Sequence, residues 1–236
     1  MGRALCWPNR GVRTSSHEGE LSKAYDLLAS LPLRDQLLTG DALYCQRAVC
    51  RQTVESQGDY LVIVKANQKS LYEDIEYLFA EPPPGEQFGQ VAQLHRHGDR
   101  REMRRLWASS ALCGYLDWPG VAQVCKVERR TERKGKVSEE VRYAITSLGS
   151  EVKPEQLLRH IRGHWAIENR LHYVRDVTFG EDASQVRTGG APQVMAALRN
   201  VVISILRAEG WNNIAAGLRY TGWRPREALR LLGLDL

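Results

Sequence analysis

The sequence predicts an α/β fold on the basis of three observations. Two apolar segments, LLTGD at 37–41 and DYLVIVKAN at 59–67, have the length and composition of buried strands. Stretches with helical periodicity precede, separate and follow them, and this alternation implies parallel strands joined by helical crossovers. A later region, 101–148, instead alternates apolar and polar residues around a Lys-Gly turn, which is typical of antiparallel strands.

The first half of the chain contains three predicted helices around the two strands. Apolar residues recur at intervals of three and four over 17–31, 46–58 and 68–81, which predicts a helix in each range. The third helix is expected to end at PPPG, residues 82–85, because proline cannot continue a helix. The run DYLVIV is almost continuously apolar and rich in β-branched residues, as expected of a strand that is buried on both faces.

The second half is predicted to form antiparallel strands followed by helices. The strands lie within 101–148, with a hairpin tip near 132–138. A long helix is expected over 155–176, another over 192–208 and a last short one over 226–233.

Composition narrows the class of protein. The chain has 236 residues, of which 43% are hydrophobic, enough for one core or for one core with a small appendage. Its net charge of +5 mildly favours an anionic partner. No apolar run approaches a membrane span, and five cysteines without CxxC spacing predict a reducing, cytoplasmic environment. Residues 1–16 show no period and are expected to form a disordered leader ahead of a single domain over 17–236.

Asp41 is the first candidate for a chemical role. It ends an apolar strand, and ligands of α/β folds bind beyond the carboxyl ends of parallel strands, where a carboxylate can hold Mg²⁺. The alternative is that Asp41 caps the helix that follows. Lys65 and Asn67 end the second strand on the same side of the sheet, where they either contact phosphate or serve as plain turn residues.

The second candidate is the segment IRGHWAIENRLHYVRDVTFGEDAS, residues 161–184. Positions three and four apart share a face of a helix, and Glu168 at its centre is predicted to share a face with Ile161, His164, Trp165, His172 and Arg175. A stripe of Ile167, Leu171 and Val174 is expected to pack on the sheet. The polar residues of this face could instead form a surface Glu–Arg pair. They could also form a zinc site from His164, Glu168 and His172, although HxxxExxxH is not the HExxH pattern of zinc enzymes.

Basic residues cluster in two runs. Residues 95–105 hold five arginines and two acids, and residues 126–136 hold six basic residues and two acids. Such runs are usually solvated faces, but on adjacent strands of one sheet they could bind phosphate. Trp118, Trp165 and Trp211 are interpreted as core residues.

Five segments carry a family resemblance. They are LLTGDALYCQ, GDYLVIVKANQKSLYEDI, YAITSL, IRGHWAIENRLHYVRDVTFGEDASQVR and LRNVVISIL. In order and wording they resemble the DDE transposases of bacterial insertion sequences, of the H-repeat-associated type, over about residues 17–208.

The resemblance implies an RNase H-like catalytic core, with a mixed sheet and flanking helices. In this family two aspartates and a glutamate bind two Mg²⁺ ions (or Mn²⁺) that act on DNA at insertion-sequence ends and targets, where the protein can form a homo-oligomer. Asp41, in the family's DA-x-x-x-Q segment, matches the second aspartate, and Glu168 matches the glutamate. His164 and Arg175 match positions where relatives carry basic residues that orient DNA phosphate or support the carboxylate.

One departure from the family pattern concerns the first aspartate. It should lie on the first strand of the core, before SSHEGELSKAYDLL, yet Met1–Ser16 contains no acidic residue. The sequence therefore predicts a truncated transposase that lacks the first strand or strands of the sheet, exposes a sheet edge and does not carry out strand transfer. The alternatives are a non-catalytic DNA-binding remnant that uses the basic runs, and the product of a pseudogene without a function.

Overall fold

The computed structural model describes residues 4–6, 20–167 and 173–234. The chain divides into two compact units, Met1–Trp165 and Ala166–Leu236. The first unit is α/β and the second is helical, a division that the sequence did not indicate. Among the helices described, none is both long and apolar enough to cross a membrane.

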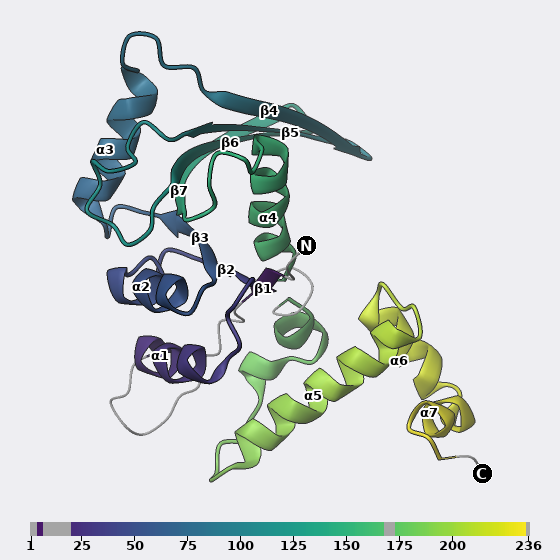
Figure 1. Ribbon diagram of the computed structural model, residues 1–236. Coiled ribbons are helices and arrows are strands. Elements are labelled where there is room, and N and C mark those ends of the chain that lie inside the picture. Colours follow the sequence, from purple (N-terminus) through teal and green to yellow (C-terminus); the bar gives the residue numbers. More distant parts are fainter. Residues whose placement is uncertain (1–3, 7–19, 168–172, 235–236) are drawn as a thin grey trace. The chain divides into compact units, whose positions relative to one another are not determined.

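The first unit is built on a mixed seven-stranded sheet (Figure 1). Across the sheet, the strands follow the order β1 (Ala4–Cys6), β2 (Leu37–Gly40), β3 (Asp59–Val64), β7 (Lys136–Thr146), β6 (Gln123–Arg133), β5 (Arg100–Ser109) and β4 (Gly89–His97). The first three strands are parallel, and all the later pairings are antiparallel. The mixed sheet expected of an RNase H-like fold is thereby confirmed.

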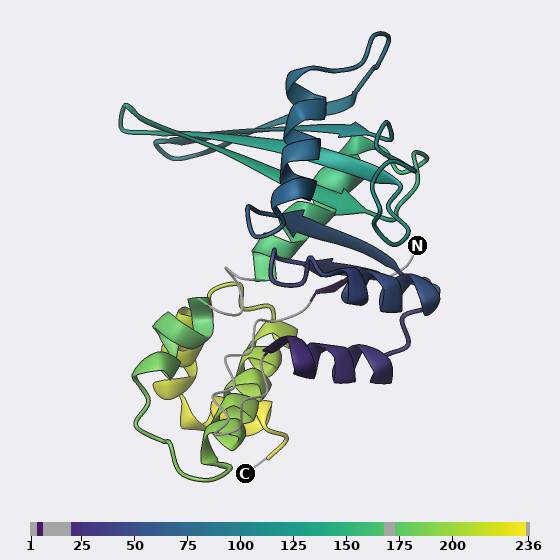
Figure 2. The ribbon, with the colours of Figure 1, turned by 90° about the vertical axis from the view of Figure 1, so that its left-hand side faces the viewer.

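Helices cover both faces of this sheet (Figures 1 and 2). On one face lie α1 (Glu20–Ser30), α2 (Arg47–Glu55) and α3 (Lys69–Ala80), and on the other lies α4 (Pro154–Ile167). Strand β3 serves both cores, as predicted: Tyr60, Val62 and Val64 belong to the first core cluster, whereas Leu61 and Ile63 belong to the second. Leu157, Leu158 and Ile161 complete the second cluster from α4.

The segment expected to be a disordered leader differs from that expectation at Ala4–Cys6. These three residues form β1, which pairs in parallel with β2 from Ala4↔Leu37 to Cys6↔Thr39. The edge of β2 is therefore covered by another strand, in contrast to the bare edge that the sequence suggested. Strand β1 could not be predicted from the sequence, because three residues are too few to show the alternating pattern of a strand.

The second unit consists of helices around a small apolar core. After a π-helical turn, η2 (Val174–Thr178), and a 3₁₀ turn, η3 (Glu181–Ala183), it contains α5 (Ala191–Ala208), α6 (Ile214–Gly222) and α7 (Pro225–Leu231). Ile203, Leu206 and Ile214 form the buried centre. Val174 packs against this cluster, so its expected place on the sheet is wrong.

The expected α-helix over 155–176 is only partly correct. Helix α4 is described over Pro154–Ile167, as predicted, but Val174–Thr178 follow π-helical geometry, which changes the angle between successive side chains. The remaining predicted helices lie within a few residues of their observed bounds, and the hairpin tip between β6 and β7 falls inside the predicted range. Strand β4 and helix α6 were not predicted from the sequence.

Candidate metal centre

Asp41 directly follows β2 and lies half-buried in a tight turn. Its Oδ1 accepts a hydrogen bond from the Leu43 amide at 3.0 Å, and its carbonyl accepts one from the Tyr44 amide at 3.1 Å. This is the local turn that aspartate side chains favour. Within the described part of the chain, Oδ2 of Asp41 takes part in no hydrogen bond or ion pair. One carboxylate oxygen is thus held in place and the other is left for a ligand.

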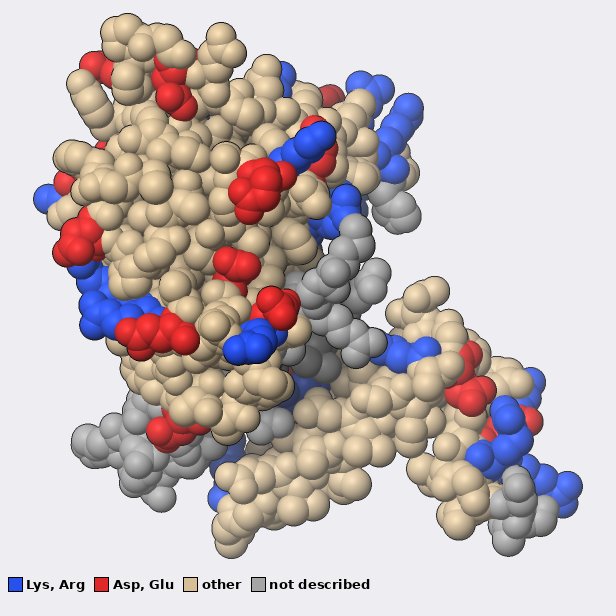
Figure 3. All heavy atoms as spheres, viewed as in Figure 1, with Lys and Arg blue, Asp and Glu red and all other residues tan. Residues whose placement is uncertain are grey.

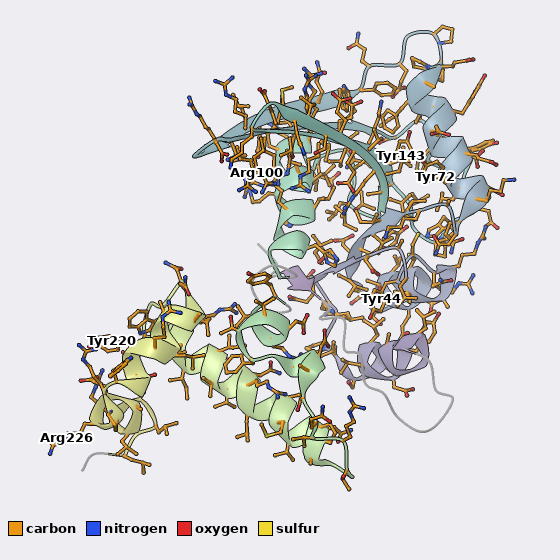
Figure 4. The ribbon with its side chains drawn as sticks, turned by 180° about the vertical axis from the view of Figure 1, so that it is seen from behind. Tyr44, Tyr72, Arg100, Tyr143, Tyr220 and Arg226 are labelled. Carbon is orange, nitrogen blue, oxygen red and sulfur yellow. The ribbon has the colours of Figure 1, made fainter. Side chains whose placement is uncertain are left out.

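Gly40 allows this turn to close. A Cβ atom at this position would lie only 2.9 Å from the Cβ of Tyr44, so a larger residue would push the turn open. Tyr44 is labelled in Figure 4, next to the end of β2. The close approach explains why a glycine ends the strand immediately before Asp41.

The alternative role for Asp41, as the cap of the following helix, is wrong. Helix α2 begins at Arg47, its N-cap is Gln46, and the N-cap side chain makes no capping hydrogen bond. The Asp41 carboxylate instead bonds within its own turn.

The loop after β3 is tied to the Asp41 turn by two side-chain amides. Nδ2 of Asn67 donates to the carbonyl of Ala42 at 3.3 Å, and Nε2 of Gln68 donates to the carbonyl of Cys45 at 2.8 Å. Asn67 thus lies beside Asp41, as its place at the end of the neighbouring strand suggested. Its amide binds backbone, which favours the turn role, while phosphate contacts by Lys65 and Asn67 stay predictions.

Of the residues that were predicted to share a helix face with Glu168, the structure describes the side chains of Ile161, His164 and Arg175. Glu168 and His172 lie outside the described residues, as do the side chains of Trp165 and Ile167. Ile161 is 1% exposed and packs in the core, so the start of this face is buried against the sheet. His164 is buried on the last turn of α4 in the first unit, whereas Arg175 belongs to the second unit.

Arg175 is held by an ion pair. Its Nε and a terminal nitrogen donate to the two carboxylate oxygens of Glu181, and Arg199 lies 3.7 Å from the same carboxylate. The hydrogen bond to Glu181 raises the pKa of Arg175 against the opposing effect of burial. The pairs join η2, η3 and α5 within the second unit, and a phosphate contact by Arg175 stays a prediction.

The described residues supply one good ligand for a hard cation. Asp41 offers an unpaired carboxylate oxygen, the kind of donor that Mg²⁺ prefers. Among the parts of the chain that the structure describes, no group of three or more His, Cys, Asp or Glu could hold a metal ion. The zinc arrangement of His164, Glu168 and His172 involves residues outside that part.

The two basic runs lie on neighbouring strands. Residues 95–105 span the hairpin of β4 and β5, and 126–136 cover most of β6, which pairs with β5. The juxtaposition that would make a phosphate-binding surface plausible is therefore present. Of the tryptophans, Trp118 is buried and its Nε1 donates to Sγ of Cys50 at 3.3 Å, and Trp211 packs against the core of the second unit.

Comparison with known proteins agrees with this fold and these motifs. The sequence matches the transposase DDE domain family over residues 12–205. It is 30% identical over 207 residues to "Putative transposase YncI" of Escherichia coli O157:H7, covering 83% of this chain and 52% of that protein. It is 29% identical over 218 residues to "H repeat-associated putative transposase YhhI" of Escherichia coli K12, covering 88% and 56%. The chain spans about half the length of these curated relatives.

The chain is only weakly similar to the solved structures that it matches. A sugar N-methyltransferase, KedS8 from Streptoalloteichus, is matched at 10% identity with a TM-score of 0.24, over 56% of this chain and 48% of that one. Such a score does not indicate a shared fold. The family match covers most of the chain and agrees with the five motif segments, and the chain therefore belongs to the DDE transposase family.

Proposed function

We propose that this chain carries part of the catalytic core of a DNA transposase, with Asp41 and Glu168 as metal ligands. The observation that supports it best is the Asp41 turn, which holds one carboxylate oxygen and leaves the other for a cation at the carboxyl end of β2. Bound Mg²⁺ or Mn²⁺ would activate a water or hydroxyl nucleophile and stabilise the leaving oxygen of a phosphodiester. The proposed substrate is DNA, at insertion-sequence ends and target sites. Because the substrate is DNA, we propose that the protein acts in the cytoplasm.

The roles of the chain's own residues follow from their contacts. Asp41 binds the cation, and Asn67 and Gln68 hold the turn that orients it. Lys65, the exposed first residue of the same loop, is suited to contact a phosphate of the bound DNA. Glu168 supplies the second carboxylate by its family correspondence, with His164 and Arg175 supporting the site.

A polypeptide of these 236 residues taken alone is proposed to lack strand-transfer activity. By the family correspondence it contains two of the three metal carboxylates, because residues 1–16 hold no aspartate or glutamate. Two-metal chemistry depends on ligands that fix both ions in position. With one ligand set incomplete, we expect weak cation binding and no joining of DNA ends.

The metal assignment is tested by Mn²⁺ titration of the purified chain, followed by calorimetry. We expect weak binding that is lost in Asp41→Asn and in Glu168→Gln and is unchanged in Glu73→Gln, which alters an exposed acid on α3. Binding by Asp41→Asn equal to that of the unaltered chain would remove Asp41 from the site, and no binding by any form would contradict both assignments.

The activity is tested on insertion-end DNA in Mg²⁺ and in Mn²⁺. We expect neither cleavage nor joining. Cleavage that disappears in Asp41→Ala would show that the two carboxylates suffice, and would overturn the proposal of an inactive polypeptide.

A second candidate function is DNA binding without catalysis. It is favoured by the basic runs on β4–β5 and β6, which adjoin in one sheet. Phosphate contacts release counterions, so binding should weaken steeply with salt. Binding to duplex DNA that does not depend on salt would count against this candidate.

A further inference from the structure

The strands β4–β7 have two faces with different charge. Successive side chains of a strand alternate between the faces, and the registers assign each residue to one of them. One face, here named the α4 face, begins with Leu106 and Val127, which pack in the same core as α4. Farther out along the strands it carries six cations and two acids: Arg100, Glu102, Arg104, Arg129, Arg133, Lys136, Glu140 and Arg142.

The opposite face carries more acids and fewer cations. Its charged residues are Arg96, Arg101, Arg105, Lys126, Glu128, Arg130, Glu132 and Glu139. Two of its cations are neutralised by a neighbour, Lys126 by Glu128 at 3.0 Å and Arg130 by Glu139 at 3.1 Å. Both faces are therefore positive, with a net charge of +4 on the α4 face and +2 on the opposite face.

A single buried carboxylate organises the α4 face. Glu102 is 7% exposed and forms ion pairs with Arg100 at 2.5 Å, with Arg129 at 3.3 Å and with Arg104. One negative charge is thus shared by three guanidinium groups. From α4, Arg162 adds another cation beside this group, held by Gln93 at 2.7 Å.

The described residues leave part of this cluster without hydrogen-bond partners. The buried Nε atoms of Arg100, Arg104 and Arg129 have no hydrogen-bond partner among the described residues. Burial and the neighbouring cations, Arg162 first among them, lower the pKa of Arg104 despite the opposing effect of Glu102. Arg100 and Arg129 keep 42% and 31% of their side chains exposed, so an external anion can reach them. Such an anion would relieve the repulsion among the cations.

The length of the charged part of the α4 face suits an extended polyanion. The charged part of the α4 face covers residues 100–104 of β5 and 129–133 of β6, which corresponds to a length of about 17 Å, because the inner ends of both strands are buried against α4. Half a turn of B-DNA is about 17 Å long and carries phosphates on both strands along that distance. Figure 2 shows β4–β7 reaching past the helices, Figure 3 shows Lys and Arg gathered at the free ends of these strands, and Arg100 is labelled on them in Figure 4.

We propose that the α4 face of β4–β7, organised by Glu102, docks the phosphate backbone of duplex DNA. This inference rests on the proposal that DNA is the partner, and it assigns the contact to one face of one sheet. Glu102 is a positioning residue here, because it acts on the DNA only through the three arginines that it holds.

The test compares two double variants that remove the same charge from opposite faces. Arg100→Gln with Arg129→Gln alters the α4 face, and Arg101→Gln with Arg105→Gln alters the other. Binding of a fluorescent 30-base-pair duplex is followed by anisotropy over a range of salt, without divalent ions. For the α4-face variant we expect at least tenfold weaker binding, and a salt slope reduced by about 1.8, since each lost phosphate contact removes about 0.9. The opposite-face variant should stay within about threefold of the unaltered chain.

The outcomes separate the possible failures. Equal losses on the two faces, or a larger loss on the opposite face, would overturn the assignment of the face. Equally tight binding of heparin or single-stranded DNA would overturn duplex DNA as its partner. No binding by the unaltered chain would contradict DNA as partner altogether. Glu73→Gln should bind the duplex unchanged, because this exposed acid lies on α3 and belongs to neither face of β4–β7.

Should the α4-face variant fail to fold, a second pair keeps the test open. Arg133→Gln with Lys136→Gln alters the same face at the hairpin end, where Arg133 is 68% exposed. These two residues take no part in the Glu102 cluster. The same loss of affinity and of salt slope is expected from them, and unchanged binding would overturn the proposal.

Discussion

Asn67 donates its side-chain amide to the carbonyl of Ala42 at 3.3 Å, and so ties the loop after β3 to the turn that begins with Asp41. The two residues are neighbours because β2 and β3 are adjacent parallel strands whose carboxyl ends meet at one edge of the sheet. The position of the candidate metal ligand therefore depends on a hydrogen bond between loops that are 25 residues apart.

Asn67→Ala should loosen this turn. Losing one partly buried hydrogen bond is expected to cost about 1 kcal/mol in the free energy of unfolding, measured by urea denaturation. Mn²⁺ binding at Asp41 should weaken as well, because the turn is less well held. Lys65→Ala serves as the control, since Lys65 is exposed and should leave stability unchanged. Equal stability of the two variants would mean that the Asn67 bond does not hold the turn.

Glu102→Gln should destabilise the first unit by about 2 kcal/mol at pH 7. It removes the negative charge shared by three arginines, and the cost is lower than for a fully buried pair because Arg100 and Arg129 are partly exposed. Glu139→Gln is the control, because its pair with Arg130 is exposed on both sides. A loss for Glu102→Gln no larger than that for Glu139→Gln would contradict the organising role of Glu102.

The stabilisation from Glu102 should also depend on pH. Burial acts to raise the pKa of Glu102, but the combined effect of its three arginine neighbours is larger and opposite, so the pKa is lowered overall. A carboxyl group with a lowered folded pKa contributes stability above its unfolded pKa and loses it as the pH falls through the folded value. The difference in unfolding free energy between the unaltered chain and Glu102→Gln should therefore be largest near neutral pH and shrink in acid. A difference that grew in acid would contradict this sign.

In the second unit, Glu181→Gln should loosen the packing of η2 and η3 against α5. Glu181 accepts both hydrogen bonds of the Arg175 fork and lies near Arg199. We expect about tenfold faster amide exchange in η2 and α5, measured by hydrogen exchange. Arg175→Lys should behave similarly, because lysine cannot donate in a fork. Glu227→Gln, on an exposed pair with Arg230, should change nothing. Unchanged exchange in Glu181→Gln would show that the network is not structural.

The cysteines should differ sharply in reactivity. Burial raises the pKa of the Cys50 thiol to about 11 and that of Cys125 to about 12, and it raises that of Cys45 as well, whereas Cys113 is exposed. Only a thiolate reacts with iodoacetamide. In a Cys6→Ser background at pH 7.5, mass spectrometry should find modification at Cys113 alone until urea unfolds the chain. Early modification of Cys45 or Cys50 would indicate that the α2 core opens readily.

Local sequence patterns were sufficient to predict the elements whose side chains are buried. Residues 60–64 (YLVIV) are apolar without interruption, which is typical of a strand covered on both faces, and β3 is such a strand. Strand β4 was not predicted because it lies at the edge of the sheet and carries polar, exposed residues such as Gln90 and His95. Helix α6 was not predicted because Gly217 and Gly222 dilute its periodicity.

The sequence by itself determined the α/β alternation, the antiparallel hairpin, the motif order that identifies the family, and Asp41 as a residue at the end of a strand. Tertiary structure alone decided which groups meet. Strand register brings Arg129 to Glu102, and the adjacency of β2 and β3 brings Asn67 to Ala42. Val174–Thr178 form a π-helical turn, a backbone geometry that the helical spacing of the sequence did not indicate. Periodicity along a chain reports which side of an element is buried, whereas contacts between elements depend on register and backbone geometry that no local pattern contains.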